Sequence, residues 1–145
     1  MKRISAAAAL GVAALWAGAA FAEPAAQVAI HVDENDLQRL NMVLNNAMNI
    51  DAYYDERGEE AEIAIVAYGP GLHMLREDTS PVKDRVEMMA FEHPNITFRG
   101  CQNTADAMAE KEGTAPEMID GVAMVESGAQ HLIELQQQGW QYLRP

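Results

Sequence analysis

Cys101 is the residue of this sequence whose type and position best fit a chemical role. It is the single cysteine among 145 residues, so the chain cannot form an internal disulfide. It follows an apolar run that predicts a strand and precedes a segment that predicts a helix. The N–H groups and the dipole at a helix N-terminus favour the thiolate, which is the nucleophilic form of cysteine. The position therefore predicts a reactive thiol, with a buried structural cysteine or an intermolecular link as the alternatives.

His31 lies near the end of another apolar run and is the candidate base for this thiol. A neutral imidazole can take a proton from cysteine, whereas the alternative is a strand-end histidine that hydrogen-bonds only to backbone. The predicted ligand-binding residues offer backbone N–H groups, amides or a hydroxyl: Gly69, Gly71, Gly100, Gln102, Asn103 and Thr104. No His or Cys pair has the spacing of metal ligands, so we expect neither a metal nor a cofactor.

The strands and helices that must position these residues alternate along the sequence. Apolar or β-branched segments predict strands at 27–32, 62–68, 96–98, 122–125 and 140–143. Helical patterns occur near 37–48, 82–90, 104–111 and 127–138. Ser80 and Pro81 are the expected start of the second helix, and the charged residues 51–60 are expected to form a loop. The alternation predicts an α/β fold with a mainly parallel sheet and helices on both sides.

Ligands of open parallel sheets bind at the carboxyl ends of the strands. Four loops are expected at that edge, and they comprise residues 31–36, 69–71, 100–104 and 126–128. We therefore expect Cys101 and His31 to lie on the same edge of the sheet.

Residues 1–22 have the pattern of a secretory signal peptide. Lys2 and Arg3 precede an almost wholly apolar run, and Ala20–Ala22 fits the small-x-small cleavage pattern. The alternative is a membrane anchor, for which the run is short and rich in alanine. The sequence thus predicts export to the periplasm, cleavage, and a single mature domain over residues 23–145.

Acidic residues dominate the mature part of the chain. All 22 Asp and Glu but only 8 of the 10 Lys and Arg lie in residues 23–145, which gives a formal charge of −14. Such a charge repels phosphate backbones and anionic lipid, so we expect neither nucleic acid nor membrane as a partner of the mature protein. Asn41, Asn45 and Asn49 recur at helical spacing and predict either an oligomer contact or a solvated face.

Four motifs resemble the DsrE/DsrF-like proteins. They are the Asn-rich segment 40–49, the run 62–71 ending in Gly-Pro-Gly, Phe-Arg-Gly-Cys-Gln-Asn-Thr at 98–104, and Gly-Trp-Gln-Tyr-Leu-Arg-Pro at 139–145. The resemblance implies a three-layer α/β/α fold with a mostly parallel five-stranded sheet, and homo-oligomers. Sulfur-relay members carry a persulfide on a cysteine after the third strand, a position that Cys101 matches. This chain departs from them in its expected export and in Asp106 and Glu110, where basic residues are common.

Two functions are consistent with these observations. The first is sulfur handling through Cys101, as a persulfide carrier or relay protein that meets a sulfur donor or acceptor protein. The second is a non-catalytic oligomeric module that binds a small ligand or a partner, in which Cys101 is structural.

Overall fold

The structure is a computed structural model and describes residues 23–145, so the predicted signal peptide lies outside the described residues. The strands are β1 (Ala26–Val32), β2 (Ala61–Ala67), β3 (Ile96–Cys101), β4 (Val122–Val125) and β5 (Gln141–Leu143). The helices are α1 (Leu37–Asp55), the 3-10 helix η1 (Gly69–Leu75), α2 (Lys83–Glu92), α3 (Gln102–Glu112) and α4 (Gly128–Gln137). No helix in this part of the chain is both long and apolar enough to cross a membrane.

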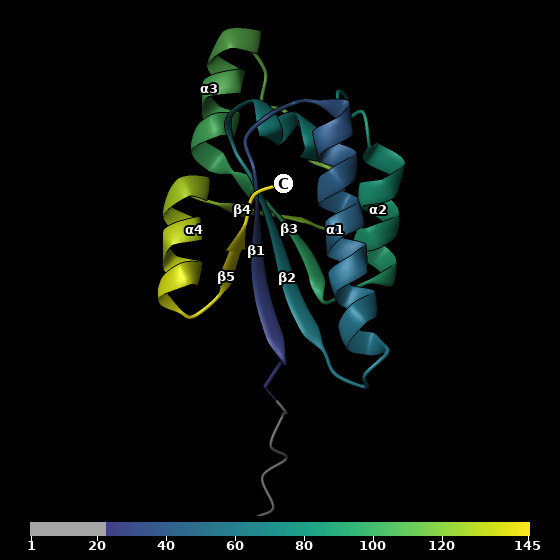
Figure 1. The fold of residues 1–145 in the computed structure, drawn as a ribbon. Helices are drawn as coiled ribbons and strands as arrows, with labels where there is room; N and C mark the ends of the chain where they lie inside the picture. Colours follow the sequence, from purple (N-terminus) through teal and green to yellow (C-terminus); the bar gives the residue numbers. More distant parts are fainter. Residues whose placement is uncertain (1–22) are drawn as a thin grey trace, which may run out of the picture.

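The strands form one five-stranded sheet in the order β4-β3-β2-β1-β5, and all neighbouring pairs are parallel. Helices α1 and α2 cover one face and α4 covers the other, while α3 stands at the carboxyl end of the sheet (Figure 1). The predicted α/β fold with a parallel sheet and three layers is therefore confirmed.

Both faces of the sheet are apolar because both are covered by helices. On the first face, Ile30, Ile65 and Phe98 pack against Leu40 and Leu44 of α1. On the second face, α4 packs against small side chains of the central strands. The residues of this second layer are Ala29, Ala64, Val66, Leu132, Leu135 and Trp140.

Two expected boundaries were wrong. Helix α1 continues to Asp55, although 51–60 was expected to be a loop. Its last turns are held by tertiary contacts, since Tyr54 packs against the core and Asp51 accepts hydrogen bonds from His93 and Asn95, which lie just before β3. Helix α2 begins at Lys83 rather than after Ser80, because the Ser80 hydroxyl donates to the Met74 carbonyl and does not cap a helix.

Arg76 joins the end of η1 to α3. Its side chain is only 3% exposed and donates paired hydrogen bonds to both carboxylate oxygens of Asp78 and of Glu112, at 2.7–2.9 Å. These hydrogen bonds raise the pKa of the guanidinium, and burial opposes them. The C-terminal turn of α3 is therefore fixed to the body of the domain through one buried arginine.

Candidate functional site

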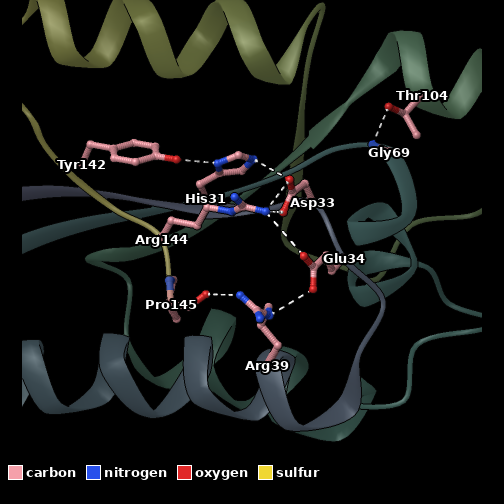
Figure 2. A network of polar contacts seen from close by, with 9 residues as sticks. All are labelled: His31, Asp33, Glu34, Arg39, Gly69, Thr104, Tyr142, Arg144 and Pro145. Carbon is pink, nitrogen blue, oxygen red and sulfur yellow. Dashed lines mark hydrogen bonds and ion pairs between the residues drawn. The ribbon is translucent and has the colours of Figure 1, made fainter.

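The carboxyl edge of the sheet brings together residues from three of the four predicted loops around Cys101. Cys101 is the last residue of β3 and the residue that precedes α3, so strand and helix meet without an intervening loop. Thr104 in the first turn of α3 accepts a hydrogen bond from the backbone N–H of Gly69, at 3.0 Å (Figure 2). This bond ties the turn after β2 to the helix that follows Cys101.

The Cys101 thiol is buried, and the residue is only 4% exposed. Burial raises the pKa of the thiol, whereas hydrogen bonds from the Thr104 hydroxyl and from nearby backbone N–H groups lower it. Those N–H groups belong to Gly128, Thr104 and Asn103. The hydrogen bonds outweigh burial, so the pKa of Cys101 lies below its ordinary value. The site favours a negatively charged sulfur.

Gly128 lies in one of the four predicted edge loops but was not among the predicted site residues, and it lets α4 approach Cys101. A Cβ built at Gly128 would lie 3.0 Å from the Tyr68 side chain and 3.3 Å from the Cβ of Cys101. The absence of a side chain therefore allows the first residue of α4 to direct its N–H at the thiol. The first residues of two helices, α3 and α4, thus lie around one cysteine.

His31 belongs to a neighbouring cluster and makes no hydrogen bond to Cys101 among the described residues. Its ring stacks on Tyr68 with centroids 4.8 Å apart, and its Nδ1 lies 2.6 Å from the Tyr142 hydroxyl. Its buried Nε2 has no hydrogen-bond partner and lies 3.7 Å from an Asp33 carboxylate oxygen. With the Tyr142 hydroxyl as donor, the ring proton sits on Nε2 and faces that carboxylate. The predicted proton transfer from Cys101 to His31 thus has no direct hydrogen bond to carry it.

The C-terminal residues cover His31 from the side of β5 (Figure 2). Arg144 pairs with both oxygens of Asp33 at 2.9 Å, and Arg39 donates to the carbonyl of Pro145 at 2.7 Å. These contacts join segments more than 100 residues apart, so no local sequence signal could have revealed them.

The other predicted ligand-binding residues differ in their surroundings. Gly71 packs against β1, where a Cβ would come within 2.4 Å of the Val32 carbonyl oxygen, and Gly100 packs against the side chains of Leu72 and Met124. These two glycines permit close packing instead of lining an open site. Gln102 and Asn103 are exposed at the start of α3, and Gln102 donates to Asp106 at 2.7 Å.

The predicted oligomer stripe on α1 has a partner within the chain. Arg85 of α2 donates to the amide oxygens of Asn41 at 2.6 Å and of Asn45 at 2.8 Å. The sequence missed this pairing because 40 residues or more separate the partners. These two amide oxygens are thus engaged between α1 and α2.

A cavity of about 1,080 Å³ lies at the opposite edge of the sheet, where the strands begin. Asp51, Glu60, Glu62 and His93 are among its lining residues. It contains no thiol, and no group of three or more His, Cys, Asp or Glu in residues 23–145 is arranged to hold a metal ion. This cavity therefore offers carboxylates and an imidazole, whereas the thiol lies at the carboxyl edge.

Fold and site define a parallel α/β/α protein with one buried thiol between the first residues of two helices at the carboxyl edge of its sheet. The chain belongs to the same family as MTH1491, a protein of unknown function from Methanobacterium thermoautotrophicum whose structure is known. The two are 31% identical and superpose with a TM-score of 0.71 over 83% of this chain and 99% of that one. Protein-family models give no match to the sequence. Curated proteins give no match either.

Stability is expected to fall as the pH is lowered below about 6.5, the ordinary pKa of histidine. Burial lowers the pKa of His31, Arg144 lowers it further, and Asp33 opposes them. The unfolded state therefore binds more protons than the folded state at pH values between the two pKa values of His31. The contribution of His31 is present above the unfolded pKa and is lost as the pH falls toward the folded one.

Urea unfolding between pH 8 and pH 5 measures this loss. His31→Gln should reduce the dependence of the free energy of unfolding on pH. His131→Gln should reduce it by a separate amount, because burial also lowers the pKa of His131. An unchanged slope in His31→Gln would contradict the assignment.

Proposed function

We propose that the mature protein carries sulfane sulfur as a persulfide on Cys101. The observation that carries this proposal is the set of donors around the sulfur, with the Thr104 hydroxyl and N–H groups from α3 and α4. Such donors stabilise the thiolate before transfer and the charged terminal sulfur after it. Residues 98–104 resemble the DsrE/DsrF-like proteins, whose sulfur-relay members carry a persulfide on a cysteine at the position of Cys101, and this resemblance supports the same function.

Sulfur transfer is balanced without an external oxidant or reductant. The Cys101 thiolate attacks the outer sulfur of a persulfide or polysulfide, and a new S–S bond forms on Cys101. The S–S bond of the donor breaks, and its electron pair leaves with the donor's thiolate. An acceptor thiolate then takes the outer sulfur in the same way and restores the Cys101 thiolate. The low exposure of Cys101 favours a small donor, or a partner protein that docks at this edge.

The protein acts, in this proposal, in the periplasm after removal of residues 1–22, as a homo-oligomer with a sulfur donor or acceptor protein as its partner. The formal charge of −14 in the mature part makes nucleic acid and anionic lipid unfavourable partners. Asp106 and Glu110 are both exposed on α3, so an acceptor that docks there would be expected to carry basic residues.

Intact mass of the mature protein after brief exposure to polysulfide tests the proposal. We expect the wild type to gain one or more sulfur atoms that a thiol reductant removes, and Cys101→Ser to gain none. If the folded wild type gains nothing while the denatured protein does, Cys101 is a structural thiol and the proposal is wrong.

A second candidate is an oligomeric module that binds a small apolar ligand, with Cys101 as a structural residue. The observation in its favour is a cavity of about 320 Å³ between α1 and the C-terminal strand. Its lining residues are Asn46, Asn49, Ile50, Tyr53, Tyr54 and Leu143. Under this function, Cys101→Ala retains partner binding and phenotype, whereas loss of both would exclude it.

A further inference from the structure

Tyr68 is the neighbour of Cys101 on the adjacent strand. The parallel register of β2 and β3 pairs Ala67 with Gly100, so the next residues, Tyr68 and Cys101, lie side by side on one face of the sheet. The backbone N–H of Tyr68 donates to the Val32 carbonyl at 3.0 Å and continues the ladder between β1 and β2 as far as this residue. Neighbouring strands lie about 4.8 Å apart, which places the two side chains next to each other.

Gly128 of α4 contacts both residues. A Cβ built at Gly128 would lie 3.0 Å from the Cβ and the Cδ1 of Tyr68 and 3.3 Å from the Cβ of Cys101. The side chains of Tyr68 and Cys101 therefore begin within contact distance of one point at the start of α4. On the other side of Cys101, Val125 of β4 lies in register with it. Tyr68 is the largest of these three neighbours, and it is half-buried, whereas Cys101 is buried.

The ring of Tyr68 is held in place from the side of β1. It stacks on the His31 ring with centroids 4.8 Å apart and an angle of 25° between the planes, and the His31 Nδ1 lies 2.6 Å from the Tyr142 hydroxyl. Stacking of aromatic rings is favourable beyond the area that it buries, so it opposes rotation of the Tyr68 ring. Because β2 lies between β1 and β3, the ring stands between the imidazole of His31 and the thiol of Cys101.

We propose that the Tyr68 ring forms a wall of the thiol site and restricts Cys101 to small sulfur donors, of which hydrogen polysulfide is the simplest. This inference rests on the proposed function and names the substrate class of the same site. With disulfane, HS–SH, the Cys101 thiolate attacks one sulfur and a new S–S bond forms on Cys101. The S–S bond of the donor breaks, and its electron pair leaves with hydrosulfide. A persulfide on a protein would reach the thiol only after the ring had moved.

The hydroxyl of Tyr68 is not needed for this role. Burial raises the pKa of the hydroxyl, and the charges of Asp33 and Cys101 raise it further while Arg144 opposes them. The hydroxyl therefore stays protonated at neutral pH and adds no charge beside the thiolate. Phenylalanine at this position should thus preserve the size limit, because it keeps the ring.

The first test compares two uncharged alkylating reagents, the small iodoacetamide and the larger iodoacetanilide, which carries a phenyl ring. The ratio of their rates on one protein cancels any change in the fraction of thiolate. We expect Tyr68→Ala to raise the rate of iodoacetanilide relative to iodoacetamide by roughly 3- to 10-fold, because no ring has to leave its stacking partner before the larger reagent enters. His31→Ala, which removes that partner, should change the ratio in the same direction, and Tyr68→Phe should keep the wild-type ratio.

Tyr53→Ala is the matched control, because Tyr53 is an exposed tyrosine on α1, which covers the opposite face of the sheet (Figure 1). If far-UV circular dichroism shows that Tyr68→Ala does not fold, Tyr68→Val carries the same comparison, since valine suits a strand and also lacks the ring. An unchanged ratio in the Tyr68 variant, or an equal change in Tyr53→Ala, would overturn the inference.

Sulfur uptake, followed by intact mass, separates this inference from the proposed function. The donors are hydrogen polysulfide, glutathione persulfide and persulfidated serum albumin. We expect the wild type to react fastest with hydrogen polysulfide, and Tyr68→Ala to narrow the difference between the donors. Equal rates of the wild type with the smallest and the largest donor would overturn the size limit while leaving the proposed function intact. If the wild type takes sulfur from none of them, the proposed function fails. A raised alkylation ratio in Tyr68→Ala then still supports the wall, and an unchanged ratio overturns it as well.

Discussion

Replacing Arg76 with alanine is expected to lower the free energy of unfolding by about 3 kcal/mol, because loss of one member of a buried ion pair typically costs 3–5 kcal/mol. The value lies at the lower end of that range because Asp78 and Glu112 are themselves partly exposed. The substitution also removes the buried stem of the side chain and the contact of its guanidinium Nη1 with the Met108 sulfur of α3 at 3.5 Å. The C-terminal turn of α3 would lose its attachment to the body of the domain.

Urea unfolding of the mature protein at neutral pH measures this loss. Arg57→Ala is the matched control, because Arg57 is exposed and lies over the ring of Tyr53 at the surface, where its removal should cost less than about 0.5 kcal/mol. Equal stabilities of the two variants would show that Arg76 does not hold α3 in place.

Thr104→Val is expected to slow alkylation of Cys101 by iodoacetamide about tenfold at pH 7, since a hydrogen bond to a charged group contributes about 1.5–3 kcal/mol. Valine keeps the shape of the side chain but removes the hydroxyl that lowers the pKa of the thiol. The higher pKa leaves less thiolate, and the greater intrinsic nucleophilicity of a more basic thiolate offsets only part of the loss. The same change removes the acceptor for the Gly69 N–H.

Alkylation rates from pH 5 to pH 10 separate these effects. The rate profile of Thr104→Val should move to higher pH and approach the wild-type rate at its alkaline end. Thr104→Ser should keep the wild-type profile, and Thr114→Val, in the exposed segment after α3, serves as a control for the substitution itself. A uniform decrease at every pH would indicate blocked access and would contradict a role of the hydroxyl in the pKa.

The two predictions concern opposite ends of the same helix. Arg76 fixes the last turn of α3 through Glu112, and Thr104 fixes the first turn through Gly69. Because the first turn of α3 supplies donors to Cys101, the attachment at both ends keeps those donors aimed at the sulfur. Arg76→Ala should therefore also weaken the hydrogen bonds from α3 that lower the pKa of the Cys101 thiol.

Local sequence patterns predicted most of the elements of this chain. The alternation of apolar strands and amphipathic helices predicted the parallel α/β fold, because strand and helix periodicities act over a few residues. The position of Cys101 between a strand and a helix followed from the same patterns. The long α1 and the late start of α2 did not. Contacts of Asp51 with His93 and Asn95, more than 40 residues away, decide the end of α1, and the hydrogen bond of the Ser80 hydroxyl to the Met74 carbonyl in η1 decides the start of α2.

The sequence by itself determined that one thiol follows a strand and precedes a helix, and that the domain is α/β. Only the tertiary structure decided which groups surround that thiol. The return of the chain to place β5 beside β1 brings Tyr142 and Arg144 to His31, and the packing of α4 brings Gly128 to Cys101 and His131 to Arg99. These contacts depend on strand order and on the fit of helix faces to the sheet. Both follow from burial of apolar surface across the whole domain, so no short stretch of sequence predicts them.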